Sequence, residues 1–145
     1  MTSIRFRLAT LAFLLGSPAY AVDTPAADPA AELTQARAAI DAGDYTAAIG
    51  TLTALVQTSP DNADALNLLG YASRKSGDLE GAARWYDAAL SADPDHLGAL
   101  EYQGELFIML GDIAAAEANL ARLAAACGVC EEHEELAQAL ADLGS

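Results

Sequence analysis

Two cysteines, Cys127 and Cys130, are the side chains in this sequence whose type and spacing could most readily do chemistry. They stand in the motif Cys-Gly-Val-Cys, and the whole chain has no other cysteine. In an oxidising compartment, such a pair is expected to form a structural disulfide. Closing so small a loop would stabilise the fold by roughly 2 kcal/mol through the entropy of the unfolded chain. It would also fix the turn between two helices.

Two other interpretations of the cysteine pair remain open. Cys130 is expected near the start of a helix, which favours a reactive thiolate and would suit a redox-active dithiol. Thioredoxin-like proteins carry this motif beside a βαβ pattern, however, and that pattern is absent here. Cys127, Cys130 and His133 also have the spacing of a zinc or copper site, with Glu134 adjacent. Glu131 stands where haem attachment needs a histidine, so that use of the motif is excluded.

The remaining polar side chains do not form a pattern that is typical of an enzyme. The sequence has no glycine-rich phosphate loop and no Gly-x-Ser-x-Gly motif. Its carboxylates are expected at helix ends and on exposed faces, where acidic residues normally lie. We therefore predict that the protein is not an enzyme and needs no cofactor. The alternative to a binding function is a metal-binding or redox accessory role through Cys127 and Cys130.

The first 21 residues have the features of a cleaved signal peptide. Two arginines precede an apolar run, Leu8 to Leu15, that is too short to span a bilayer. Small residues then precede a cleavage point that we place after Ala21. The composition of residues 1–21 favours export to the periplasm of a Gram-negative bacterium. Residues 22–29 hold two prolines and small side chains, which predict a disordered linker.

The mature chain is expected to be strongly acidic. Five basic and 21 acidic residues remain once the signal peptide is removed, which gives a formal charge of −16. Binding to nucleic acid or to an anionic membrane needs clustered lysine and arginine, so both are excluded as partners. The charge favours a soluble monomer and rapid capture of basic partners at low ionic strength.

The sequence repeats itself with a period of 34 residues. Gly-Asp pairs begin at Gly43, Gly77 and Gly111, and a segment rich in alanine and leucine follows each of them. The apolar residues recur at helical spacing, and no alternating run of β-branched residues indicates a strand. The pattern predicts three helix-turn-helix units and a final capping helix. These units are residues 30–62, 63–96 and 97–130, and the capping helix is residues 131–145.

The repeat resembles the tetratricopeptide repeat (TPR) in its length and in its signature residues. The clearest copy has small residues, Gly70 and Ala82, where two helices approach closely, and the large Tyr86 beside them. Pro94 stands in the turn that closes this copy. The first copy departs from the family in its first helix, as is common in a terminal repeat. The resemblance implies an all-α solenoid, and it implies a function as an adaptor or scaffold that binds another protein or a peptide.

In TPR proteins, the first helix of each repeat lines a concave groove, and the resemblance carries this role to particular positions. The predicted groove residues are Arg37, Asn67, Tyr71, Arg74, Lys75, Glu101 and Glu105. The basic members would hold a peptide carboxylate or backbone, whereas the two glutamates would meet a basic segment. The alternative is that all of them lie on ordinary solvated helix faces. The lysine and asparagine pattern of carboxylate-clamp TPR domains is absent, so binding of a chaperone C-terminus is not predicted.

Overall fold

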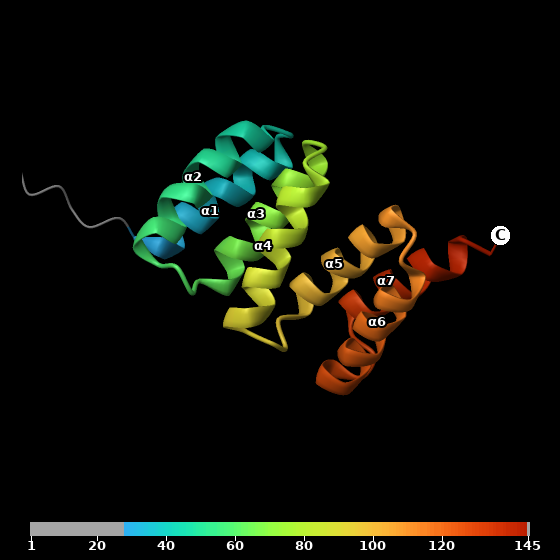
Figure 1. Ribbon diagram of the computed structural model, residues 1–145. Coiled ribbons are helices and arrows are strands. Elements are labelled where there is room, and N and C mark those ends of the chain that lie inside the picture. Colours follow the sequence, from blue (N-terminus) through green and yellow to red (C-terminus); the bar gives the residue numbers. More distant parts are fainter. Residues whose placement is uncertain (1–27, 145) are drawn as a thin grey trace, which may run out of the picture.

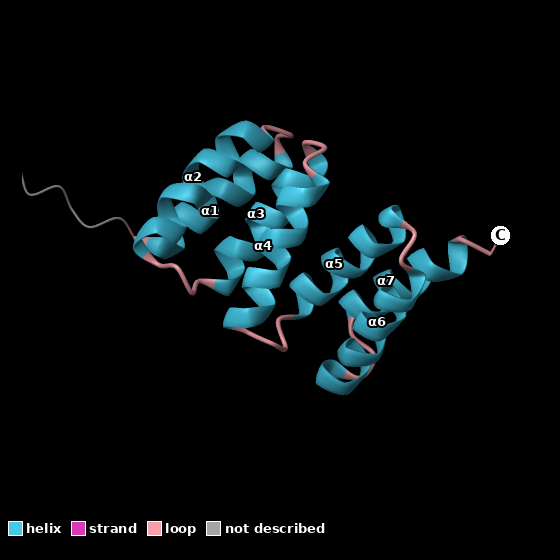
Figure 2. Cartoon of the chain, in the orientation of Figure 1, coloured by secondary structure: helices cyan, strands magenta, loops and turns pink. Residues whose placement is uncertain are grey.

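The computed structural model describes residues 28–144, and this part of the chain forms seven helices and no strand (Figures 1 and 2). The helices are α1 (Pro29–Asp41), α2 (Tyr45–Thr58), α3 (Ala63–Lys75), α4 (Leu79–Ala92), α5 (Leu97–Leu110), α6 (Ile113–Cys127) and α7 (Glu131–Asp142). The all-α solenoid predicted from the sequence is confirmed. None of these helices is long and apolar enough to cross a membrane. The predicted signal peptide and most of the predicted linker lie outside the described residues.

The helices pack in sequence order, as Figure 1 shows from blue to red. α1 packs on α2, α3 on α4 and α5 on α6, which gives three helix pairs. The second helix of each of the first two pairs also contacts the first helix of the next pair, so the pairs stack into one solenoid. α7 packs against both α5 and α6. It therefore covers the side of the last pair that a further pair would cover in a longer solenoid.

Each Gly-Asp pair of the 34-residue repeat forms the turn inside one helix pair. The turns are Gly43-Asp44, Gly77-Asp78 and Gly111-Asp112. The glycines have φ angles of 75°, 89° and 80°, a left-handed conformation that ends the first helix at little steric cost. The aspartate side chains then accept hydrogen bonds from the backbone N–H groups of Ala47, Gly81 and Ala115, at 3.0, 2.8 and 3.1 Å. Each Gly-Asp pair thus ends one helix and begins the next.

Two glycines lie where neighbouring helices approach so closely that a side chain would not fit. A Cβ atom at Gly70 of α3 would overlap the ring of Tyr86, which is fully buried on α4. This contact confirms the predicted packing of Tyr86 against a small residue. A Cβ atom at Gly104 of α5 would lie 2.5 Å from Leu136 Cδ2 of α7. Leu136 is also fully buried, so α7 is seated on α5 through this contact.

A short chain of hydrogen bonds fixes α5 between α4 and α6. Asn119 of α6 is buried, and its Nδ2 donates to the carbonyl of Leu100 and to Oε1 of Gln103, both at 3.1 Å. Gln103 Nε2 in turn donates to Asp87 Oδ1 of α4 at 2.7 Å. Because buried amides are costly when unpaired, these bonds favour one orientation of α5. The opposite face of α5 points to the inner side of the solenoid.

Candidate functional site

The inner side of the solenoid, formed by α1, α3, α5 and α7, carries two adjoining hollows. The larger, which we call the acidic groove, has a volume of about 800 Å³. It is lined by Tyr71, Arg74, Lys75, Glu101, Tyr102, Glu105, Glu134, Glu135, Gln138, Ala139 and Asp142. The smaller, which we call the tyrosine pocket, has a volume of about 290 Å³ and is lined by Arg37, Ile40, Asp41, Leu68, Tyr71 and Tyr102. Tyr71 and Tyr102 line both, so the hollows meet at this pair.

Six of the seven predicted groove residues line these hollows. Arg37 lines the tyrosine pocket, Tyr71 lines both hollows, and the other four line the acidic groove. Asn67 is the exception, because only 7% of it is exposed. A Cβ atom at Gly98 of α5 would lie 3.0 Å from Asn67 Nδ2, so this amide packs between α3 and α5. Whether the other six bind a partner stays a prediction.

The basic side chains of the predicted groove are mostly paired within the protein. Arg74 Nη2 lies 2.5 Å from Glu105 Oε2, and only 11% of the Arg74 side chain is exposed. The Arg74 guanidinium also lies over the rings of Tyr71 and Tyr102, 5.6 and 5.8 Å from their centroids. Burial lowers the pKa of Arg74, but Tyr86 and Glu105 outweigh burial and hold that pKa above its ordinary value. Arg74 therefore contributes little uncompensated charge for a ligand carboxylate.

The two other predicted cations differ from Arg74. Arg37 Nη2 lies 3.8 Å from Asp64 Oδ2, and both side chains are more than half exposed, so this pair is weak. Lys75 is exposed at the end of α3, with its Nζ 5.8 Å from the centroid of the Tyr71 ring. Lys75 thus remains the one predicted groove cation that no ion pair neutralises among residues 28–144.

Glu101 is the least expected feature of the acidic groove. The sequence predicts it on an open helix face, yet only 3% of it is exposed. Burial raises its pKa to about 9, with further contributions from a hydrogen bond to Glu135 and from the charges of Glu135, Glu105 and Glu132. Near neutral pH, Glu101 is therefore a protonated carboxyl group that shares a hydrogen bond with the Glu135 carboxylate of α7.

Tyr71 and Tyr102 form an aromatic surface between the two hollows. Their ring centroids are 5.0 Å apart, and the rings are tilted by 51°. Both rings are half-buried. Burial raises the pKa of Tyr102 to about 12, with smaller contributions from Glu101 and other neighbours, so its hydroxyl is neutral under ordinary conditions. The pair can pack against an apolar side chain, or it can hold a cation over a ring face.

Sequence reasoning missed the contribution of α7 to the acidic groove. Glu134, Glu135, Gln138 and Asp142 recur at helical spacing, on the side of α7 that does not carry the buried Leu136. The helix dipole alone accounts for an acidic start of a helix, so the sequence gives no reason to look further. The helical spacing of these polar residues was the one sign in the sequence. It indicates a groove only once the packing of α7 against α5 is known.

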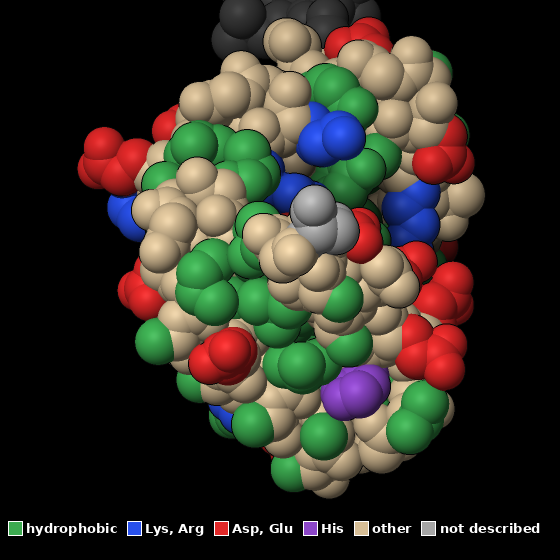
Figure 3. All heavy atoms as spheres, turned by 90° about the vertical axis from the view of Figure 1, so that its right-hand side faces the viewer, with side chains coloured by type: hydrophobic (Ala, Val, Ile, Leu, Met, Phe, Trp, Pro, Cys, Tyr) green, Lys and Arg blue, Asp and Glu red, His purple; other side chains and the backbone are tan. Residues whose placement is uncertain are grey.

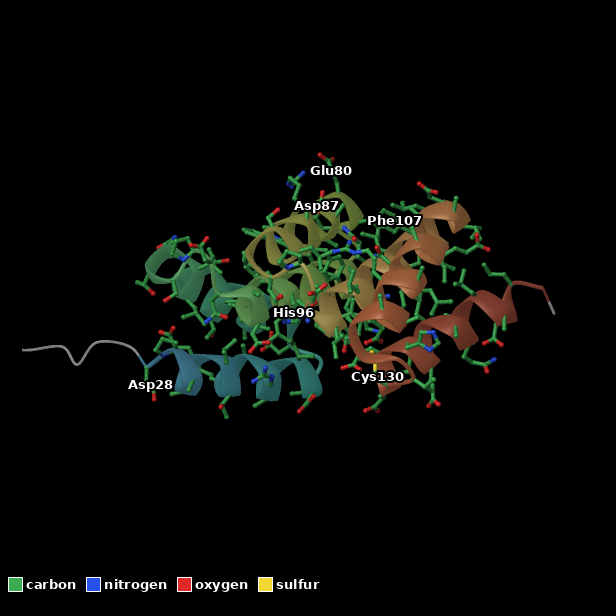
Figure 4. The ribbon with its side chains drawn as sticks, turned by 90° about the horizontal axis from the view of Figure 1, so that it is seen from below. Asp28, Glu80, Asp87, His96, Phe107 and Cys130 are labelled. Carbon is green, nitrogen blue, oxygen red and sulfur yellow. A yellow bond between two sulfur atoms is a disulfide. The ribbon has the colours of Figure 1, made fainter. Side chains whose placement is uncertain are left out.

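His96 holds the start of α5 against the start of α3, and it lies near the centre of the view in Figure 4. Its Nδ1 accepts a hydrogen bond from the backbone N–H of Ala99 at 3.1 Å, which caps α5. Its Nε2 lies 3.1 Å from Asp64 Oδ1. A neutral imidazole with its hydrogen on Nε2 makes both bonds at once. These contacts position the helices that frame the tyrosine pocket.

Cys127 and Cys130 are joined by a disulfide with an S–S distance of 2.04 Å (Figure 4). Cys127 is the last residue of α6, and Cys130 immediately precedes α7, so the bond spans the turn between these helices. With both sulfur atoms bonded to each other, neither is a thiolate that could bind a metal. No group of three or more His, Cys, Asp or Glu side chains within residues 28–144 is arranged to hold a metal ion.

Comparison with known proteins agrees with this architecture. A sequence model of the tetratricopeptide repeat family matches residues 33–97. No curated protein sequence matches the chain. The first TPR of Spaghetti (RPAP3) bound to the HSP90 peptide SRMEEVD is similar in structure, with 17% identity and a TM-score of 0.71. That match covers 81% of this chain and 96% of the other.

Two bacterial structures are also similar. The type III secretion chaperone SycD of Yersinia enterocolitica, in complex with a peptide of the translocator YopD, matches with 18% identity and a TM-score of 0.68, over 79% of this chain and 87% of that one. A thermophilic TPR protein of Thermus thermophilus matches with 24% identity and a TM-score of 0.72, over 81% of this chain and 66% of that one. At these identities the likeness establishes the fold. Together with the family match to residues 33–97, it shows that this chain contains tetratricopeptide repeats and has the fold of a TPR solenoid.

Proposed function

We propose that this protein is a non-catalytic adaptor or scaffold that binds an extended segment of another protein along its inner face. The observation that carries the proposal is the junction of the two hollows at Tyr71 and Tyr102. A path from α1 across α3 and α5 to α7 lets one segment touch all four helices. It offers aromatic surface in the middle and charged side chains on both sides of it, which suits a peptide with mixed side chains.

The related structures support peptide binding by this fold. Spaghetti was solved with an HSP90 peptide and SycD with a YopD peptide, and both share the solenoid fold. Those peptides differ, and fold alone does not select a partner. Three helix pairs and a cap offer a limited contact area. We therefore expect an affinity of about micromolar, unless a partner adds contacts elsewhere.

Site-specific photocrosslinking tests the proposal. A benzoylphenylalanine is placed at Lys75, which is exposed and lines the acidic groove, or at Arg84, which is exposed on α4 and lines neither hollow. The first position should crosslink to a discrete partner in the native cell, and the second should not. Equal crosslinking from both positions, or none from Lys75 and none from a second probe at Gln138, would contradict binding in the groove.

The compartment is part of the same proposal. The signal-like residues 1–21 and the disulfide between Cys127 and Cys130 both favour an exported protein in the oxidising periplasm. Intact mass of the protein purified from its native cell tests this. The expected mass is that of a chain beginning at Val22 with two hydrogens lost. A full-length chain with free thiols would contradict export.

A further inference from the structure

Glu101 is a buried carboxyl group that has no cationic partner among residues 28–144. Only 3% of it is exposed, yet it lines the acidic groove. No Lys, Arg or His of these residues forms an ion pair with it, whereas Glu105, one turn further along α5, pairs with Arg74 at 2.5 Å. Proteins rarely bury a carboxyl group without a partner, because burial strongly disfavours its charged form. Packing alone therefore does not account for a carboxyl group at this position.

Glu101 shares a hydrogen bond with a second carboxyl group, that of Glu135 on α7. Glu132 of α7 and Glu105 of α5 add negative charge nearby. Arg74 of α3 lines the same groove, but it is already paired with Glu105. Glu101 therefore stays neutral by holding a proton, with its pKa raised to about 9. Protonation removes the negative charge that a cationic partner would otherwise balance.

The rest of the groove is suited to a long cationic side chain. Tyr71 and Tyr102 stand beside Glu101 in the lining, and both rings already lie within 5.8 Å of the Arg74 guanidinium. The volume of about 800 Å³ exceeds that of any single side chain. Because stems of lysine and arginine pack on aromatic rings, the two tyrosines can hold the stem while the head reaches the carboxyl groups.

The charge around the groove also favours a cation. α7 contributes Glu134 and Glu135 to its lining, while the charge of Arg74 is cancelled by Glu105. Figure 3 views the side of the molecule that carries α6 and α7, where red acidic side chains lie mainly toward the edges of the view. The whole chain has a formal charge of −14. This field attracts basic segments and repels acidic ones.

We propose that the acidic groove receives a lysine or arginine side chain of the bound segment, with its cationic head between the carboxyl groups of Glu101 and Glu135. This inference rests on the function proposed above and names the chemistry of the partner. When the cation enters, the proton of Glu101 leaves to solvent, and both carboxylates then face the positive charge. Peptide binding near neutral pH should therefore release a proton.

Selection from a library of random peptides displayed on phage, against the immobilised protein, tests the inference. The protein is compared with the double variant Glu101→Gln/Glu135→Gln and with the control Glu80→Gln/Glu117→Gln. The control removes the same number of carboxylates from exposed positions that line neither hollow. Circular dichroism establishes that each variant is folded. Bound peptides are then synthesised with lysine or glutamine at the enriched basic position, and calorimetry in two buffers counts the protons released.

We expect a lysine or arginine to be enriched at one peptide position, and its change to glutamine to weaken binding by about tenfold or more. The double variant should lose this discrimination, and the control should keep it within about twofold. Peptides that bind the groove without a required basic residue, or a double variant that keeps the preference, would overturn the inference and leave the proposed function standing. If no peptide binds and Lys75 crosslinks to nothing, the proposed function itself is wrong, and the inference fails with it.

Discussion

Arg74 Nη2 lies 2.5 Å from Glu105 Oε2, and this ion pair joins α3 to α5 beside the acidic groove. The two residues belong to neighbouring helix pairs, so the contact also links two repeats. Because Arg74 is only 11% exposed, its charge acts inside the solenoid more than at its surface. The pair thus supports the geometry of the groove and takes little part in its net charge.

Replacing Arg74 by glutamine should destabilise the protein by about 1–3 kcal/mol, because Glu105 loses its charged partner at a half-buried site. Urea denaturation measures this change. The matched control is Arg84→Gln, which breaks an exposed pair with Glu80 inside α4 and should cost less than about 1 kcal/mol. Equal losses from the two variants would mean that the pair between helices has no special role.

Replacing Glu101 by glutamine should change how stability depends on pH. The pKa of Glu101 is about 9 in the folded protein, against an ordinary value of 4.5. Between these values, the folded state binds a proton that the unfolded state lacks, so stability falls as pH rises. Glutamine cannot ionise, so the free energy of unfolding of the variant should rise relative to the parent by up to about 1.4 kcal/mol per pH unit in this range.

Thermal melting from a pH below 4.5, the ordinary pKa of the group, to mildly alkaline pH measures the difference. The two proteins should melt alike at the acidic end, where Glu101 is protonated in both states, and the variant should melt higher at the alkaline end. Glu117→Gln, at an exposed position of α6, serves as the control and should run parallel to the parent. Parallel curves for Glu101→Gln as well would show that Glu101 is ionised in the folded protein.

Replacing Gly70 by alanine should destabilise the protein by about 1–3 kcal/mol, because the new methyl group would overlap the Tyr86 ring. Gly50→Ala is the control, since a Cβ atom at this exposed helical position meets nothing within 4 Å. It should stabilise the protein by about 0.5–1 kcal/mol through helix propensity. Chemical denaturation of both variants shows whether the free energy of unfolding falls or rises. An unchanged free energy of unfolding for Gly70→Ala would refute the tight contact between α3 and α4.

Reducing the disulfide should loosen α7 more than any other helix. The bond restricts the turn between α6 and α7, and its loss should cost about 2 kcal/mol. Hydrogen exchange of the protein, with and without reductant, should show faster exchange in residues 131–142 and little change in α3 and α4. The variant Cys127→Ser/Cys130→Ser should reproduce the effect. Unchanged exchange in α7 would show that Leu136 alone secures the helix.

The architecture could be predicted from the sequence because its determinants are local and repeat. Each Gly-Asp pair stops one helix and starts the next by its own backbone conformation and capping bond, and it does so three times. The contact between Gly70 and Tyr86 was also predictable, because the small and the large residue hold fixed places in each repeat.

The groove could be predicted only in part, because its details depend on contacts between repeats. Family positions place Glu101 on an open face, but the closeness of α7 buries it against Glu135. Asn67 is expected in the groove as well, and the missing side chain at Gly98 lets α5 cover it. Nor does any local pattern state that Arg74 meets Glu105, since the pairing depends on how two helix pairs stack.

The docking of α7 has a consequence for assembly. Leu136 closes a cluster with Leu100 and Leu123, and all three are fully buried. Without α7, this apolar surface would face water at one end of the solenoid, where an equivalent helix pair of another molecule could stack on it. Head-to-tail contacts of that kind do not close, so they grow into filaments. The single helix α7, held by Leu136 and the disulfide, therefore covers the surface at which such stacking would begin.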